Sequence, residues 1–345
     1  MSLSVGFLTA SDESAWDAYV ARHPLASPFH LAAWKHAIEQ TFGYRPLYLF
    51  ASDSSRGMAG VLPLFLVDTV LTGRVLISTP FAVYGGILAE SPEAHAALVA
   101  ELRRLAESLR VQYVELRNAF PEQCAGFSPV DRYVTFTQPV SPMSDDELLA
   151  TVHKKTRNMV RKALKSPYSW RPAPSLDHFY RLLANNYRRL GTPVFPRSFF
   201  ERLLAGFGPL ADVREILLED RVAAVAFNFL FAGSMHTYYA ASDPGCLAQA
   251  PNNYMYFEFL RWAGHNRFHV FDFGRSKKGT GTFEFKRHWG TTLRELPYEI
   301  LLVTRKRLPN FSPQNPKFEL AIRAWRRLPL PVANALGPRL VRLFP

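Results

Sequence analysis

Cysteine is scarce, and the motifs of several large enzyme classes are missing. The chain has 345 residues and two cysteines, Cys124 and Cys246, which show neither a disulfide framework nor metal-ligand spacing and suit a reducing cytosol. The ten histidines form no HExxH pattern, and neither a P-loop nor a GxSxG turn occurs. We therefore expect no metal site and no tightly bound cofactor. A nucleophilic Cys–His pair has no support in the sequence, although it stays open.

Long apolar runs are also absent. The longest, residues 58–71, is interrupted by Pro63 and Asp68 and is too short to span a bilayer. The first ten residues lack a basic segment followed by an apolar run, so we expect no signal peptide. The sequence predicts a soluble, cytoplasmic protein, with peripheral contact at the inner face of the membrane as an open addition.

Acidic residues are few relative to basic ones. Against 41 lysines and arginines stand 29 acids, which gives a net charge of +12. This excess favours an anionic partner such as a nucleic acid, an acidic lipid, a nucleotide or a carrier protein. Charge alone does not choose among them, and a basic surface without a dedicated ligand is the alternative.

Hydrophobic residues make up 48% of the chain, and its length suggests about two domains. Element order repeats along it, which predicts an α+β protein with two similar units in residues 1–143 and 144–307. The first unit is expected to hold a helix, a hairpin, a strand, a helix and a strand at residues 27–41, 46–51 with 60–67, 75–79, 92–109 and 113–117. The second is expected to repeat this order with helices at 145–165, 175–190 and 197–207, a hairpin at 213–218 with 222–231, a strand at 235–240, a helix at 251–265 and a strand at 268–273.

A basic amphipathic tail, residues 308–345, follows the second unit. A short helix is predicted there, with Ile322 and Trp325 on one face and Arg323, Arg326 and Arg327 on others. Such a helix could anchor on an acidic membrane. The alternative is a tail that packs back on the body of the protein.

The most informative segment is residues 271–290. A strand is predicted to end at Gly274, and a glycine-rich loop then carries Arg275, Lys277 and Lys278. A second strand over residues 283–286 would place Lys286 on the face opposite its phenylalanines. Clustered cations and accessible backbone suit an oxyanionic group. An ordinary basic hairpin is the alternative.

Two other segments could contribute to the same site. On the helix at residues 145–165, Arg157 and Arg161 share one basic face with Lys154 and Lys165, for which a solvated surface is the alternative. In the strand, loop and helix start of residues 238–253, Tyr238 and Asn252 flank backbone amides that could face an anion.

The segment from FDFGRS (271–276) to Phe285 and Lys286 resembles the closing strands of FemAB-type aminoacyl and acyl transferases, which are built as tandem GNAT domains. The likeness extends over about residues 27–303, including PFHLAAW at 28–34. The FGRSK form and the arginine-rich tail look most like FemAB-related proteins of exosortase and exopolysaccharide gene clusters.

This resemblance implies acyl or aminoacyl transfer to an amine without a covalent enzyme intermediate. Lys286 matches the lysine that assists near the reacting carbonyl, and Asp272 is a weaker candidate for orienting or deprotonating the amine. Relatives that modify peptidoglycan precursors bind their acceptor through an arginine and a tyrosine, where this chain aligns Phe195 and Phe199. That departure argues against the usual peptidoglycan precursor.

The GNAT pyrophosphate turn, Arg/Gln-x-x-Gly-x-Gly/Ala, is missing from residues 242–253. Its absence favours aminoacyl-tRNA or acyl-carrier protein as donor over acyl-CoA. The leading hypothesis is therefore an N-acyltransferase of cell-envelope or exopolysaccharide biosynthesis, with no DNA partner. A non-catalytic GNAT scaffold that binds tRNA or membrane, and an ordinary CoA-dependent N-acetyltransferase, are the alternatives.

Overall fold

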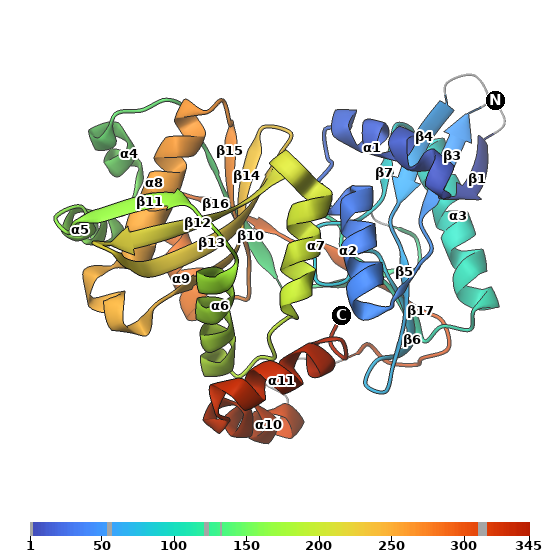
Figure 1. Ribbon diagram of the computed structural model, residues 1–345. Coiled ribbons are helices and arrows are strands. Elements are labelled where there is room, and N and C mark those ends of the chain that lie inside the picture. The colour runs from blue at the N-terminus through green and yellow to red at the C-terminus, as the bar shows by residue number, and fades with distance from the viewer. Residues whose placement is uncertain (1–2, 54–56, 121–123, 132, 310–315) are drawn as a thin grey trace. The chain divides into compact units, whose positions relative to one another are not determined.

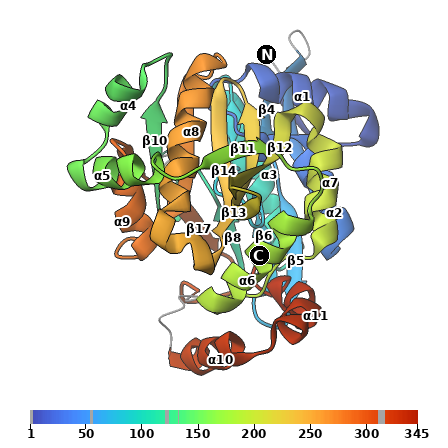
Figure 2. The same cartoon turned by 60° about the vertical axis from the view of Figure 1, so that its left-hand side comes forward.

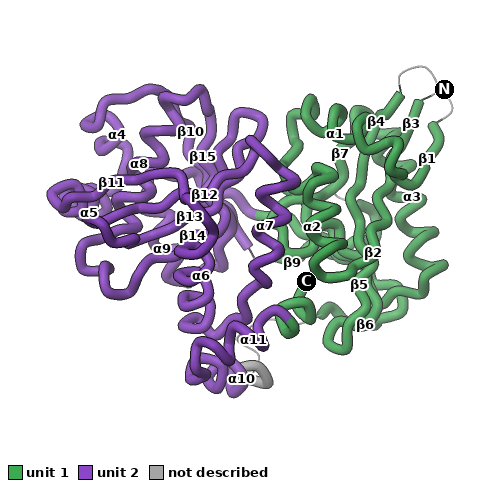
Figure 3. The backbone as a smooth tube through the Cα atoms, in the orientation of Figure 1, with its two compact units in different colours: residues 1–131, 296–318, 339–345 green, residues 132–295, 319–338 purple. Residues whose placement is uncertain are grey.

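The computed structural model describes residues 3–53, 57–120, 124–131, 133–309 and 316–345. It divides the chain into two compact units (Figures 1 and 3). Unit 1 consists of Met1–Asp131, Leu296–Phe318 and Arg339–Pro345, and unit 2 of Arg132–Glu295 and Glu319–Pro338.

Unit 1 combines two sheets with helices. Its strands form a four-stranded sheet, β1-β3-β4-β7, and a six-stranded sheet, β2-β5-β6-β8-β17-β9. The strands are β1 Leu3–Phe7, β2 Arg45–Pro46, β3 Leu49–Asp53, β4 Gly57–Leu62, β5 Phe65–Thr69, β6 Gly73–Ile77, β7 Leu88–Ala89, β8 Tyr113–Leu116, β9 Ser128–Val130 and β17 Tyr298–Leu302. The helices are η1 Ala10–Asp12, α1 Glu13–Arg22, η2 Pro28–His30, α2 Ala32–Phe42 and α3 Pro92–Ser108.

Unit 2 is built on a seven-stranded mixed sheet, β11-β12-β13-β14-β15-β10-β16. The strands are β10 Val134–Pro139, β11 Tyr168–Pro172, β12 Ala211–Leu218, β13 Arg221–Phe231, β14 Ser234–Ser242, β15 Val270–Ser276 and β16 Thr292–Glu295. The helices are α4 Asp145–Thr151, α5 Lys154–Ala163, α6 Asp177–Leu190, α7 Arg197–Phe207, η3 Gly208–Leu210, η4 Pro244–Gln249, α8 Pro251–His265 and α9 Gly281–Arg287. Helices α10 Pro316–Arg327 and α11 Leu330–Val341 form the tail.

The expected repeat of element order is confirmed. In unit 1 a strand, a helix and a parallel strand follow one another as β6, α3 and β8, and in unit 2 as β14, α8 and β15. Helix α3 begins at Pro92, as the expected range 92–109 has it, and the Ser91 side chain caps it by accepting a hydrogen bond from the Ala94 amide at 3.2 Å. Both units are thus α+β, with mixed sheets flanked by helices.

The compact units do not follow the linear division expected from the sequence. Strand β10, from the end of the first half, lies between β15 and β16 in the sheet of unit 2. Strand β17 follows unit 2 in the chain but pairs with β8 and β9 of unit 1. Backbone pairing assigns each strand to a sheet regardless of its order in the chain, and composition does not reveal such an exchange.

Two predicted elements are each split in the structure. The single strand expected over residues 60–67 is wrong, because it divides at Pro63 into β4 and β5, which join different sheets. The single helix expected over residues 145–165 is also wrong. Its chain turns extended at Val152, and His153 then caps α5 by accepting a hydrogen bond from the Lys155 amide. A capping side chain can start a new helix within a periodic pattern.

The sheet of unit 2 is covered on both faces. Helices α4, α5 and α8 contribute to one hydrophobic cluster with residues such as Met235 and Phe273 of β14 and β15, and α8 runs along the sheet in both views (Figures 1 and 2). On the other face, Phe179 of α6 and Phe200 of α7 contact Phe227 of β13 at ring distances of 6.0 and 6.1 Å. The site described below lies in this sheet.

Helix α10 of the tail packs on α6 within unit 2. Trp325 is buried, and Arg188 of α6 donates a hydrogen bond to the Leu328 carbonyl at 3.0 Å. The expectation of a tail that packs on the body is thus confirmed for α10. Residues 310–315 of the expected tail lie outside the described residues. In the parts of the chain that the structure describes, no helix is long and apolar enough to cross a membrane.

Candidate active site

Strands β14 and β15 separate after a short parallel pairing. Their register runs only from Ser234 opposite Val270 to His236 opposite Asp272. Both strands continue beyond this point, β14 as far as Ser242 and β15 as far as Ser276. Each keeps its outer neighbour, β13 or β10, so their facing edges diverge. We call this divergence the β14–β15 split.

A β-bulge lies in each strand at the split. On β14, Thr237 and Tyr239 pair with the consecutive residues Asn228 and Phe227, so Tyr238 is the extra residue. On β15, Asp272 pairs with Thr137 of β10 and Arg275 with Thr135, so β15 has one extra residue between these two pairs. Gly274, within this stretch, has a φ of +71°. Only glycine adopts this conformation at little cost. Bulges bend strands and change the direction of the side chains that follow.

Asp272 holds the bulge of β15. One carboxylate oxygen accepts a hydrogen bond from the Gly274 amide at 2.6 Å and one from the Thr135 hydroxyl at 3.3 Å. The other lies 3.4 Å from Nδ1 of His236. Asp272 is buried, and these contacts make it a group that orients its neighbours. Its action as a base stays a prediction.

Lys286 lies on a helix, and the predicted strand over residues 283–286 is wrong. The segment forms α9, which Thr280 caps by accepting a hydrogen bond from the Phe283 amide. Phe283 packs edge-on against Phe136 at 5.3 Å, and Phe285 lies 5.4 Å from Tyr256. These contacts with the core favour the helix over the alternating strand that the aromatic spacing suggested.

The helix directs Lys286 towards the split. Residues three apart share a helix face, so Lys286 lies on the same side as Phe283, not opposite to it. Its Nζ donates to the carbonyls of Gly274 at 3.0 Å and Arg275 at 3.1 Å. The pKa of Lys286 is lowered to about 8, chiefly by burial; the Asp272 carboxylate opposes this shift and the Arg275 charge adds to it. The structure thus groups Lys286, Asp272 and Arg275.

The other predicted cations, Lys277, Lys278, Arg157 and Arg161, lie on the loop after β15 and on α5. Lys278 forms an exposed ion pair with Glu295 at 2.9 Å, and the Lys277 carbonyl accepts a hydrogen bond from Thr280. On α5, Arg157 donates to the carbonyls of Ala150 and Val152, whereas Arg161 is exposed. Arg157 therefore binds backbone carbonyls at the C-terminal end of α4. The substrate-binding roles of all four cations stay predictions.

Tyr238 and Asn252 mark the two ends of the segment predicted to face an anion. Tyr238 is the bulge residue of β14, and its ring lies edge-on to Tyr239 at 4.7 Å. Asn252 lies in the first turn of α8 and is half-buried. Between them, Asp243 binds Arg221 at 2.7 Å and caps η4. This carboxylate occupies the loop that would have to accommodate a pyrophosphate.

The corresponding place in unit 1 is filled by the chain itself. Beyond the last pair of β6 and β8, the Ser78 amide donates to the Glu115 carbonyl at 3.0 Å. Arg117 is buried and donates to the carbonyls of Thr79 at 2.8 Å and Ala82 at 3.3 Å. Residues 78–82 thus cross the position in unit 1 that corresponds to the split of unit 2.

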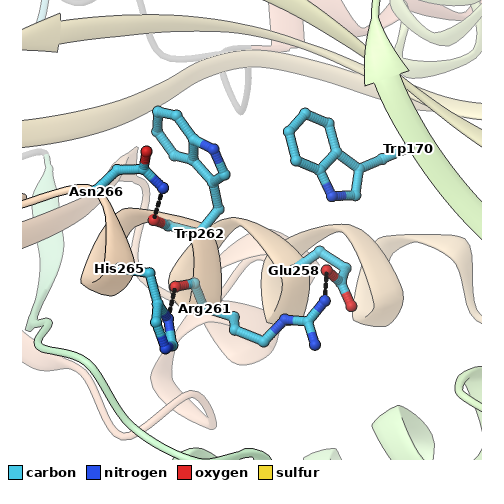
Figure 4. A pocket seen from close by; sticks show the side chains of 6 residues that line it. All are labelled: Trp170, Glu258, Arg261, Trp262, His265 and Asn266. Atoms are coloured by element: carbon cyan, nitrogen blue, oxygen red, sulfur yellow. Dashed lines mark hydrogen bonds and ion pairs between the residues drawn. The ribbon is translucent and has the colours of Figure 1, made fainter.

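A pocket of about 270 Å³ lies on unit 2 between β11 and the C-terminal half of α8 (Figure 4). It is lined by Trp170, Glu258, Arg261, Trp262, His265 and Asn266. The guanidinium of Arg214 lies 3.6 Å from the Trp262 ring and 4.9 Å from the Trp170 ring, and it also binds Asp212. These indoles therefore hold a structural arginine, and none of the predicted site residues lines the pocket.

The open alternative of a Cys–His pair has one geometric candidate. In unit 1, Sγ of Cys124 lies 3.9 Å from Nε2 of His95, which is long for a hydrogen bond. Within the described ranges, no group of three or more histidine, cysteine or acidic side chains could hold a metal ion.

Sequence reasoning missed His236, Tyr187 and Tyr239. His236 reaches the site only because β14 is parallel to β15, and Tyr239 faces α6 only because of the bulge at Tyr238. The Arg275 charge acts on both tyrosines, as described below. No residue spacing in the sequence predicts a bulge. The adjacent tyrosines at 238 and 239 do, however, interrupt the alternation of side-chain character along the strand.

Replacing Asp272 with asparagine is expected to lower the pKa of Lys286 below its present value of about 8, because the carboxylate charge that favours the ammonium form is lost. The check is the pH dependence of Lys286 acetylation by an amine-selective reagent, followed on its peptide by mass spectrometry. Exposed Lys162 provides an internal reference for reagent reactivity. A midpoint that stays in place or rises in Asp272→Asn would contradict this electrostatic coupling.

Comparisons with known proteins identify the fold. Residues 151–287 match the model of the Acetyltransferase (GNAT) domain. A comparison with curated protein sequences finds no match. Among solved structures, FemX is similar with a TM-score of 0.71 and 16% identity, over 87% of this chain and 98% of FemX.

Two further structures share the fold. A putative lysylphosphatidylglycerol synthetase C-terminal domain from Agrobacterium fabrum has a TM-score of 0.56 and 11% identity, over 85% of this chain and 92% of that domain. A tandem GNAT protein from the clavulanic acid biosynthesis pathway has a TM-score of 0.53 and 11% identity, over 89% of this chain and all (100%) of that protein. The fold is thus that of tandem GNAT proteins, and the match of residues 151–287 to the GNAT acetyltransferase domain supports an acyltransferase.

Proposed function

We propose that the protein transfers an acyl or aminoacyl group from an activated donor to an amine at the β14–β15 split. The observation that carries this proposal is the position of Lys286, whose Nζ is fixed by the carbonyls of Gly274 and Arg275. An ammonium group has three N–H donors, and these two carbonyls use two of them. The third can bind the oxygen of a reacting carbonyl.

The reaction proceeds by direct attack of the amine on an ester or thioester carbonyl. A carbon–nitrogen bond forms, and the carbonyl oxygen becomes an oxyanion that the Lys286 ammonium stabilises. Collapse breaks the carbon–oxygen or carbon–sulfur bond. The amine loses one proton and the leaving group gains one, so no enzyme nucleophile is required. Asp272 keeps Gly274 in place and thereby orients the carbonyl that binds Lys286.

The donor in this proposal is anionic, as the net charge of +12 favours. Aminoacyl-tRNA, acyl-carrier protein and acyl-CoA all qualify. The missing GNAT pyrophosphate turn in residues 242–253 supports the first two. An ordinary CoA-dependent N-acetyltransferase is the second candidate, and a non-catalytic scaffold that binds tRNA or membrane is the third.

For the acceptor, we propose an amine of cell-envelope or exopolysaccharide biosynthesis, following the exosortase-type resemblance of the sequence. Phe195 and Phe199 stand where relatives that modify peptidoglycan precursors have an arginine and a tyrosine. Both are buried in the aromatic cluster beside α7 and offer no polar group. This supports an acceptor other than the usual peptidoglycan precursor.

Lys286→Met is expected to lower kcat/KM by about 100- to 1,000-fold, the effect typical of losing one oxyanion donor. The protein is first incubated with aminoacyl-tRNA, acyl-carrier-protein and acyl-CoA pools, and the consumed donor is identified by mass spectrometry. Turnover of that donor is then compared between variants. Lys162→Met, which removes an exposed cation of α5, is the matched control and should keep wild-type turnover.

Full turnover by Lys286→Met would remove the catalytic role of this lysine. Salt-dependent RNA binding without any product would instead favour the non-catalytic scaffold. A melting temperature close to that of the wild type would show that the variant folds, since methionine removes a buried charge without leaving a large cavity.

We further propose that the exposed face of α10 contacts an anionic membrane surface. Leu320 is 74% exposed, and Arg323, Arg326 and Arg327 on the same helix are exposed as well. An exposed leucine beside arginines suits the interface of an acidic bilayer. Each basic residue near such a surface contributes about 1 kcal/mol to the free energy of membrane binding. Leu190, 55% exposed, adjoins this face, since Arg326 donates to its carbonyl.

Binding to vesicles of phosphatidylcholine with phosphatidylglycerol should exceed binding to phosphatidylcholine alone, as measured by co-sedimentation. Leu320→Glu is expected to weaken it at least tenfold by adding charge to the inserted face. Leu25→Glu, an equal charge change at an exposed leucine of unit 1, should bind nearly as well as the wild type. Equal loss in both variants would show a general charge effect and refute contact through α10.

A further inference from the structure

A buried hydroxyl beside the split needs a partner. Tyr239 is 6% exposed, and its ring is packed by Phe195 at 5.7 Å and Phe200 at 5.2 Å. Its hydroxyl has no hydrogen-bond partner among the residues that the structure describes. An unpaired buried hydroxyl destabilises a folded protein, so such a group calls for an explanation.

The two bulges change the directions of Tyr239 and Arg275. Without the extra residue at Tyr238, the alternation of β14 would place Tyr239 on the face of Met235, in the cluster beside α8. The bulge turns it to the face of α6 and α7. The bulge at Gly274 changes the direction of Arg275 in the same way, and the Arg275 guanidinium lies 4.6 Å from the ring of Tyr133.

Tyr187 of α6 completes the group. Burial raises the pKa of Tyr187 and of Tyr239 far above the neutral range, and in both cases the positive charge of Arg275 opposes the rise. Both phenols therefore stay protonated and keep their O–H groups as donors. Phe195 contacts both rings, at 6.1 Å for Tyr187 and 5.7 Å for Tyr239. Helix α6, β14 and β15 thus contribute one group each.

We infer that Arg275, Tyr187 and Tyr239 form a subsite for a carboxylate or phosphate group of the substrate. A guanidinium and two hydroxyl donors match the acceptor oxygens of such an anion. An oxygen of the bound anion would supply the partner that the Tyr239 hydroxyl lacks. This inference rests on the proposed function, because it assigns the anion to a substrate that also reaches Lys286, the neighbour of Arg275.

The subsite narrows the substrate class. A substrate held here carries an anionic group close to its reacting amine or carbonyl, as in an amino acid with a free carboxylate or a phosphorylated amine. Substrates without such a group would lose the Arg275 contact. Their transfer would depend on Lys286 alone, so the anion acts on specificity, whereas Lys286 acts on the chemical step.

The test is anion binding by the full chain, measured by isothermal titration with acetate and with inorganic phosphate at fixed ionic strength. Tyr239→Phe should weaken binding of the preferred anion about tenfold, as expected for one hydrogen bond to a charged group. Arg275→Gln should weaken it more. The stronger of the two titrations in the wild type shows whether the subsite takes carboxylate or phosphate.

A matched control separates binding from packing. Tyr48 of unit 1 is also buried with a hydroxyl that lacks a hydrogen-bond partner among the described residues. Tyr239→Phe and Tyr48→Phe should both keep or raise the melting temperature, because each removes an unpaired buried hydroxyl. Only Tyr239→Phe should lose anion affinity.

Wild-type anion binding in Tyr239→Phe and Arg275→Gln would overturn the subsite, and so would equal weakening in Tyr48→Phe. These results leave the proposed function intact, since turnover through Lys286 is measured separately. Conversely, anion binding that depends on Tyr239, combined with full turnover by Lys286→Met, would support the subsite and reject the catalytic proposal.

Discussion

The site depends on one constraint, the loss of pairing between the parallel strands β14 and β15 after His236 and Asp272. A continuous ladder would place the two backbones about 5 Å apart and leave no room for a ligand between them. The two bulges prevent this continuation, and Gly274 makes the second one possible through its positive φ. The same bulges present Tyr239 and Arg275 to the face of α6. In unit 1, by contrast, Arg117 and residues 78–82 fill the corresponding place.

Burying the Lys286 ammonium removes part of its hydration, which costs free energy. The same loss of hydration makes the charge more effective at stabilising an oxyanion. Burial lowers the pKa of Lys286 to about 8, so its ammonium form is held with less hydration than an exposed lysine would have. The carbonyls of Gly274 and Arg275 replace part of that hydration, and the Asp272 carboxylate offsets part of the cost. A poorly hydrated charge stabilises a developing oxyanion more strongly than a hydrated one. The aromatic contacts of Phe283 and Phe285 hold α9 so that this charge stays in place.

Much of this architecture could be predicted from the sequence, because local signals determine it. Helix α3 starts at its serine cap and proline, and β12 and β13 are recognisable by their apolar, β-branched and aromatic residues. Lys286 could be singled out by its cationic, glycine-rich neighbourhood and by family resemblance. Its helix could not, since Phe283 and Phe285 fit a strand by spacing, and only the Thr280 cap and the contact with Phe136 decide otherwise. Tyr187 and Tyr239 escaped notice because a bulge and a helix distant in sequence bring them to Arg275.

The most direct measurement of this account is a crystal structure of the protein with a non-hydrolysable analogue of its donor. We expect the acyl carbonyl to lie in the β14–β15 split, with its oxygen within about 3 Å of Nζ of Lys286. A donor carbonyl bound elsewhere, for example in the pocket beside Trp170 and Trp262 or in unit 1, would contradict it.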